Sequence, residues 1–122
     1  KLQETKMKVL DRTWINCLRM WKWISENLPK GFSETTEEIK NFVIESLKRR
    51  WLRKNKFTEL LLSDCFFCAY DMKHGNECKS CPARLVKRHF HCSDLKYNYA
   101  YEPVEFYNLL VKLDKKRRGP NV

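Results

Sequence analysis

Residues 7–28, MKVLDRTWINCLRMWKWISENL, decide the fold class. Apolar side chains recur along this stretch at alternating spacings of three and four residues, which places them on one face of an α-helix. This stripe consists of Met7, Leu10, Trp14, Cys17, Trp21, Ile24 and Leu28. Four further apolar residues lie beside it, namely Ile15, Leu18, Met20 and Trp23. A helix with so wide an apolar face needs cover on more than one side, from its own chain or from a partner.

The residues that follow predict a second helix with a basic end. Thr35 and Glu38 form a capping-box pattern, and apolar residues then recur at helical spacing at Ile39, Phe42, Val43, Leu47 and Trp51. Six of the nine residues at 48–56 are basic and none is acidic: Lys48, Arg49, Arg50, Arg53, Lys54 and Lys56. One or two cations suffice to complement the helix dipole, so we expect the others to form a basic patch.

A last helix is expected over residues 103–118. Pro103 suits the first helical position, and Val104, Tyr107 and Leu110 share one face. The helix finishes with four consecutive cations, Lys115, Lys116, Arg117 and Arg118, before Gly119-Pro120. These four residues are a second candidate basic surface.

Between the second and last helices, the cysteine spacing is that of a metal site. Cys65, Cys68, Cys78 and Cys81 form C-x2-C-x9-C-x2-C, and two intervening residues allow both sulfurs of a pair to reach one tetrahedral ion. We expect one structural Zn²⁺, because four thiolates leave no open coordination position. Disulfides, or an iron–sulfur cluster or redox switch, are the alternatives. Cys92, which follows His89 and His91, is an alternate ligand or a buried free thiol.

The expected architecture is therefore mainly α, a three-helix small domain with an irregular zinc-stapled insertion. We assign residues 1–122 to one domain, with a two-helix segment at 1–57, a zinc module at 63–101 and a C-terminal helix at 103–118. The apolar stripe of the first helix suits an intramolecular bundle or a homodimer.

Composition excludes several classes of protein. The chain has 122 residues, of which 43% are hydrophobic, so it has enough apolar material for a core. No apolar run reaches the roughly 18 residues of a membrane span, and the first residues lack the apolar stretch of a secretory signal. We therefore expect a cytoplasmic protein that does not contact membranes. The formal net charge of +10 favours anionic partners.

Motifs of enzymes are missing. A zinc deaminase needs H-x-E before P-C-x-x-C, but His74 is followed by Gly75 and Asn76, and Pro82 comes after the cysteine pair. The sequence also contains no G-x-S-x-G, no H-E-x-x-H and no phosphate-binding glycine loop. We predict a binding protein and not an enzyme.

The cysteine pattern resembles a module of small, uncharacterised bacteriophage proteins, in which C-x2-C, C-x2-C-P and a fifth cysteine occur in the same order. In this sequence the module is Cys65, Cys68, Cys78, Cys81-Pro82 and Cys92, with Tyr97 five residues later, and it covers about a third of the chain. The resemblance implies a phage origin, hence a place in the bacterial host cytoplasm, and a zinc-bound fold. By analogy, it implies action on a host macromolecule, for example inhibition of a defence, transcription or replication protein.

Two binding hypotheses follow. In the first, the protein inhibits or modulates a host protein, and Met20 and Trp23, which lie off the main stripe, are its exposed anchors. In the alternative, it binds nucleic acid, and the cations at 48–56 and 115–118 contact phosphates. The same cations would also suit an acidic protein surface.

Overall fold

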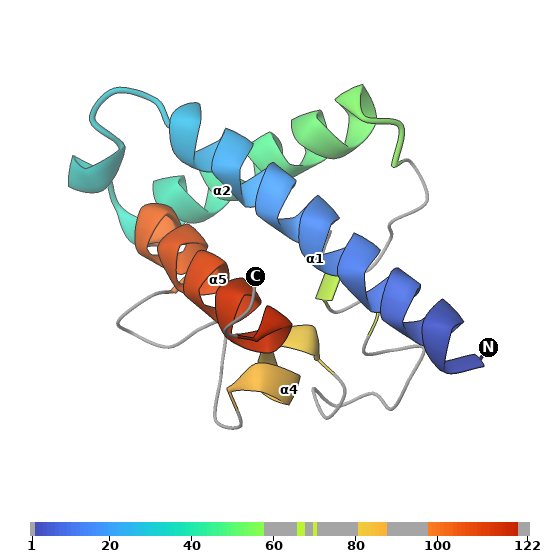
Figure 1. Cartoon of the computed structure of the whole chain (residues 1–122). Helices are drawn as coiled ribbons and strands as arrows, with labels where there is room; N and C mark the ends of the chain where they lie inside the picture. The colour runs from blue at the N-terminus through green and yellow to red at the C-terminus, as the bar shows by residue number, and fades with distance from the viewer. Residues whose placement is uncertain (1, 58–65, 68–69, 71–80, 88–97, 120–122) are drawn as a thin grey trace.

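A computed structural model of the chain is mainly helical, as the sequence predicts, and describes residues 2–57, 66–67, 70, 81–87 and 98–119. The helices in these ranges are α1 (Leu2–Glu26), the 3₁₀ turn η1 (Phe32–Glu34), α2 (Glu37–Lys54), α4 (Pro82–Val86) and α5 (Pro103–Arg118) (Figure 1). None of the described residues is in a β-strand. The C-terminal helix has the bounds that the sequence predicts.

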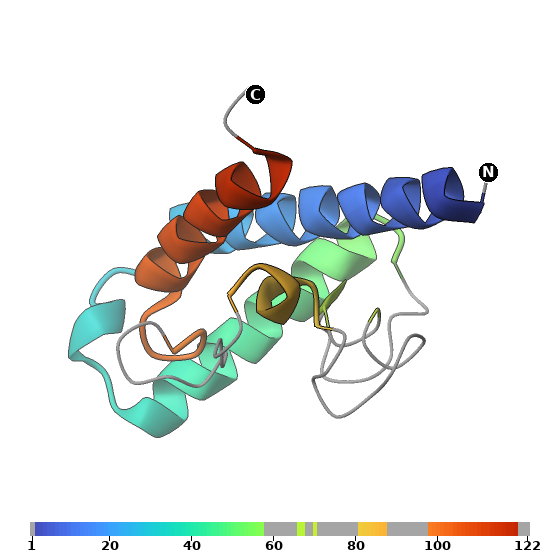
Figure 2. The same cartoon turned by 60° about the horizontal axis from the view of Figure 1, so that its bottom comes forward.

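The three long helices form two layers. Helices α1 and α5 lie side by side, and α2 crosses α1 on the opposite side of the core (Figures 1 and 2). The pairing of α1 with α5 is antiparallel, since Phe106 at the start of α5 lies 5.0 Å from Trp21, whereas Arg117 at its end lies 5.2 Å from Trp14. The short helix α4 packs against α5.

Helix α1 ends two residues earlier than its apolar stripe. Asn27 caps its last turn by donating a side-chain hydrogen bond to the Trp23 carbonyl oxygen at 2.8 Å. Pro29 follows, and the chain reverses at Gly31, whose φ of 81° is strained for any residue with a Cβ. Leu28, the last residue of the stripe, lies beyond the helix but still packs against the core.

Helix α2 starts one residue later than the capping-box pattern suggests. Its N-cap is Thr36, whose hydroxyl oxygen accepts a hydrogen bond from the Ile39 amide at 3.3 Å. Thr35 instead closes η1, where its hydroxyl donates to the Phe32 carbonyl at 3.0 Å. Thr36 rather than Thr35 is therefore the N-cap of α2, because the hydroxyl of Thr35 already forms a hydrogen bond within η1.

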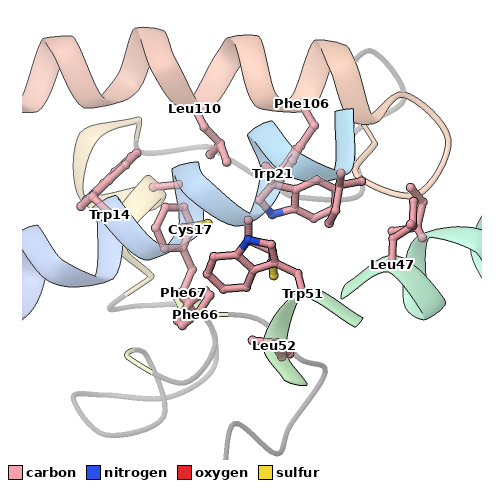
Figure 3. Close-up of a cluster of buried hydrophobic side chains, with 14 of the residues drawn as sticks. Trp14, Cys17, Trp21, Leu47, Trp51, Leu52, Phe66, Phe67, Phe106 and Leu110 are labelled. Carbon is pink, nitrogen blue, oxygen red and sulfur yellow. The ribbon is translucent and has the colours of Figure 1, made fainter. Parts of the chain in front are cut away.

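The core is built from aromatic side chains that meet between the layers (Figure 3). Trp14 of α1 contacts Phe67 edge-on at 4.7 Å, and Trp51 of α2 contacts Phe66 at 5.9 Å. Phe66 and Phe67 are the two residues between Cys65 and Cys68, and both are buried. The two residues between the first pair of cysteines of the predicted zinc module therefore belong to the hydrophobic core.

The second cysteine pair also borders this core. Cys81 is half-buried against it, and Pro82 and Ala83 at the start of α4 are fully buried. Pro82 occupies the first turn of α4, where its missing N–H costs no helical hydrogen bond. Within the described part of the chain, no helix is long and apolar enough to cross a membrane.

Candidate functional site

The helices bring one tryptophan and three cations together around a surface hollow of about 300 Å³. Among the described residues, Trp23 of α1 and Arg50, Arg53 and Lys54 of α2 line this hollow. We call it the Trp23 hollow. Trp23 was predicted as an anchor for a protein and the three cations as a nucleic-acid surface, so the fold joins residues of both hypotheses.

The burial pattern of α2 explains why the cations face outward. With 3.6 residues per turn, Leu47 and Trp51 lie on one side of α2, and both are buried in the core. Arg50 and Arg53 fall on the opposite side and are exposed. Trp23 is the neighbour of the buried Ile24 but lies on the flank of α1, where it is half-buried and still reaches the surface.

The hollow is electrostatically positive. Its described lining contains three cations and no carboxylate. Ion pairs occur elsewhere among the described residues, but none of them involves Arg50, Arg53 or Lys54. Exposed Arg49 and Lys56 lie on the same part of the chain and add to the field. The arrangement suits an anion that also presents a flat or apolar group to the indole.

Lys48 does not belong to the basic surface, although the sequence places it there. It is only 3% exposed, and its ammonium lies 3.4 Å from Glu45 Oε1 and 4.6 Å from the centre of the Tyr99 ring. Its helical position points into the core between Ile44 and Trp51. That prediction was wrong because the run of cations begins at Lys48, a position on the buried face of the helix, and only the later cations lie on exposed positions.

The four cations at the end of α5 also differ in their roles, because some form ion pairs within the fold and others are exposed. Arg117 donates to Asp11 of α1 and, at 2.9 Å, to Asp114, and Arg118 Nη2 lies 3.1 Å from Asp114. Arg117 also covers the Trp14 ring, so it fastens α5 to α1 and is not part of an open patch. Lys115 and Lys116 are exposed, as the sequence predicts.

One predicted anchor needs correction. Met20 was expected to be an exposed anchor, but it is 0% exposed, because α2 and α5 cover α1 from both sides. Trp51, set within the basic run, is buried, as its place on the apolar stripe of the second helix indicates, and it stacks on Phe57 at 5.7 Å. Of the two predicted anchors, only Trp23 reaches the surface.

An exposed apolar pair on α2 was missed by the sequence reasoning. Ile39 and Phe42 were assigned to the apolar stripe of the second helix, yet they are 49% and 72% exposed. They lie one turn apart on the outward side that also carries Arg50 and Arg53. Helical periodicity could have indicated this exposure, because the buried residues Ile44, Leu47 and Trp51 lie on a different face of α2 from Ile39 and Phe42.

The predicted metal ligands Cys65, Cys68 and Cys78, and the alternate ligand Cys92, lie outside the described residues. Cys81, the remaining predicted ligand, is half-buried at the start of α4. The described ranges alone contain no group of three or more His, Cys, Asp or Glu side chains that could hold a metal ion. Cys17 is buried on α1 as a small apolar residue, as expected from its place on the stripe.

Comparison with family models, with curated proteins and with solved structures found no match to this chain. The functional argument therefore rests on the site itself.

Proposed function

We propose that the protein is a nucleic-acid-binding protein and not an enzyme, and that the Trp23 hollow is its main contact surface. The observation that carries the proposal is the convergence of Arg50, Arg53 and Lys54 on a half-buried tryptophan, without a carboxylate among the described lining residues. Three cations on one surface can each neutralise a phosphate and release its counterion, which is the main source of affinity in such complexes. The overall charge of +10 favours the encounter.

The proposal predicts a defined dependence of affinity on salt. For single strands, the logarithm of the binding constant falls with the logarithm of salt concentration with a slope of about −0.7 per neutralised phosphate. Contacts from Arg50, Arg53 and Lys54 would therefore give a slope of about −2. Exposed Arg49 and Lys56 would steepen it.

The direct test is charge reversal in the hollow. Arg50→Glu/Arg53→Glu is compared with Lys112→Glu/Lys115→Glu, which changes the net charge equally at two exposed positions on α5. Fluorescence anisotropy of labelled oligonucleotides measures affinity at several salt concentrations. We expect the hollow variant to lose most of the affinity and to flatten the salt slope, and the α5 variant to lose much less. Equal losses in both variants would contradict a localised site, and a flat salt response of the wild type would contradict the function.

Binding to a host protein is the second candidate function, and Ile39 and Phe42 favour it. Exposed aromatic side chains beside arginines are typical of energetically important positions in protein interfaces. The partner would present an apolar group to Phe42 and carboxylates to the arginines, and the protein would act as an inhibitor or modulator of that partner.

A pull-down from nuclease-treated lysate of the bacterial host distinguishes this candidate from nucleic-acid binding. A stoichiometric partner should be retained by the wild type at moderate salt and lost with Phe42→Asp, while Val104→Asp, which introduces the same carboxylate at another exposed apolar position on a helix, retains it. If everything captured disappears with nuclease, or if both variants retain the same proteins, the second candidate fails.

We also propose that the cysteine-rich segment holds one structural Zn²⁺. The supporting observation is that residues of both cysteine pairs, Phe66 and Phe67 in the first and Cys81 in the second, belong to one core. A tetrathiolate ion would close the nine-residue loop between the pairs, and its binding energy would become folding energy.

A further inference from the structure

We infer that the Trp23 hollow seats one unpaired nucleobase on the Trp23 indole, with the adjoining phosphates on Arg50, Arg53 and Lys54, so that the protein selects single-stranded over double-stranded nucleic acid. This inference rests on the proposed function and names its ligand class. It is carried by the position of a half-buried tryptophan in the lining of a cationic hollow.

The exposure of Trp23 sets it apart from the other tryptophans. Trp14, Trp21 and Trp51 are buried, and each makes a close ring contact with a phenylalanine of the core. Trp23 packs against the same core, is only half-buried, and is one of the residues that line the hollow. A tryptophan that is held by packing and also borders a cationic hollow can serve as a rigid stacking surface for a ligand.

The surrounding cations favour a nucleotide over a plain aromatic ligand. Arg50 and Arg53 lie almost one turn apart on α2, and Lys54 lies one turn beyond Arg50, so the three charges flank the indole from the side of α2. A base stacked on Trp23 has a phosphate on either side along its strand, and these are the groups that guanidinium and ammonium ions bind. The indole therefore suits the base of a nucleotide, and the three cations suit its phosphates.

The geometry disfavours a duplex. In a double helix both faces of each base are covered by its neighbours, so a tryptophan in the lining of a hollow cannot stack on a base unless that base is first unstacked from its neighbours. A single strand offers its bases at little cost, and every base has a face that can stack, so we expect little preference for sequence. The selectivity comes from Trp23, whereas the cations alone would bind either form.

Trp23 also provides the measurement. Because the other three tryptophans are buried, a base that stacks in the hollow should quench the intrinsic fluorescence of Trp23 alone. An oligothymidylate of about twelve nucleotides is the probe, and a dA·dT duplex of the same length is the comparison. Anisotropy of a labelled oligothymidylate gives the affinity independently of the tryptophan signal.

Three variants isolate the indole. Trp23→Leu removes the stacking surface, Trp23→Phe keeps a smaller one, and Tyr107→Leu changes another half-buried aromatic that packs against the core from α5. Loss of one base stack should weaken binding by about tenfold to a hundredfold in Trp23→Leu. Trp23→Phe should recover part of this loss, and Tyr107→Leu should bind like the wild type. Circular dichroism confirms that each variant is folded.

The outcomes separate the inference from the function on which it rests. Quenching by the single strand, abolished in Trp23→Leu together with the loss of affinity, supports the inference. If Trp23→Leu binds as tightly as the wild type while Arg50→Glu/Arg53→Glu does not, the protein binds nucleic acid without stacking and the inference is overturned. Equal or tighter binding of the duplex also overturns it. If the wild type binds no oligonucleotide at low salt, the proposed function fails as well.

Discussion

The ammonium of Lys48 lies 4.6 Å from the centre of the Tyr99 ring and 5.8 Å from that of Trp21, inside the core. These contacts join α2 to α1 and to the turn that precedes α5. The electron-rich faces of the two rings and the carboxylate of Glu45 compensate the buried charge. One residue of an apparent surface run is thus an internal cation that links three parts of the fold.

The first prediction concerns this cation. Lys48→Met should change the free energy of unfolding by no more than about 1 kcal/mol, because a well-packed apolar residue of similar volume can replace a buried charge. Lys48→Glu should cost about 3–5 kcal/mol, since it places a buried carboxylate without a cation next to the half-buried Glu45. Urea denaturation measures both. Arg53→Glu, at an exposed position, serves as the control and should stay within about 0.5 kcal/mol.

Binding data give the same residue a second test. Lys48→Met should bind an oligonucleotide as the wild type does, because Lys48 does not reach the Trp23 hollow. Arg53→Glu should weaken binding severalfold. Equal losses of affinity in the two variants would show that Lys48 acts at the surface, contrary to its burial.

The second prediction concerns the junction of α5 and α1. Arg117→Ala should lower the free energy of unfolding by about 1–3 kcal/mol, because it removes hydrogen bonds to two carboxylates and leaves Asp114, which is largely buried, with fewer partners. Lys116→Ala, the adjacent exposed cation, should change it by less than about 0.5 kcal/mol. Chemical denaturation at equal salt compares them, and a loss of stability in Lys116→Ala as large as that in Arg117→Ala would contradict the assignment.

The third prediction concerns the contact between Phe67 and Trp14. Phe67→Ala should cost about 3–5 kcal/mol, since it removes a buried aromatic side chain and leaves a cavity beside the Trp14 ring. Leu85→Ala on α4 removes an apolar side chain from an exposed position and should cost less than about 0.5 kcal/mol. Thermal unfolding orders the two variants. A harmless Phe67→Ala would mean that this residue lies outside the core.

The fourth prediction concerns the metal. Purified protein should contain about one equivalent of zinc per chain, and a chelator should lower its melting temperature. Cys81→Ser should lose the zinc, whereas Cys17→Ala, which changes a buried thiol on α1, should retain it. Metal analysis by mass spectrometry measures the zinc content of both variants. Metal-free protein with the melting profile of the untreated sample would contradict a structural zinc.

Much of the fold could be predicted from the sequence because the long apolar stripes are periodic. The stripe through Trp14, Cys17, Trp21 and Ile24 identifies the buried face of α1, and Pro103 and Gly119 mark the ends of α5. Position on a helix surface was harder to predict. Met20 and Trp23 both lie beside the stripe, and only the packing of α2 and α5 decides that the first is covered and the second is not.

The candidate site could be predicted only in its parts. Arg50, Arg53 and Lys54 were recognised as a basic run, and Trp23 was recognised as an off-stripe aromatic. Their meeting depends on how α2 crosses α1, which periodicity within each helix does not define. Consecutive cations in a sequence can also lie on different sides of a helix. For this reason Lys48, which is buried, was grouped with exposed cations on the opposite side of α2.

The most direct test of the account is to locate the contact between protein and nucleic acid. An oligonucleotide carrying 5-iodouracil is crosslinked to the wild-type protein by ultraviolet light, and tryptic peptides are identified by mass spectrometry. Cleavage after Lys22 and Lys30 releases residues 23–30, which contain Trp23 and none of the other tryptophans. The account predicts that this peptide carries the principal adduct and loses it in Arg50→Glu/Arg53→Glu. Adducts confined to peptides of α5 or of the cysteine-rich segment would contradict it.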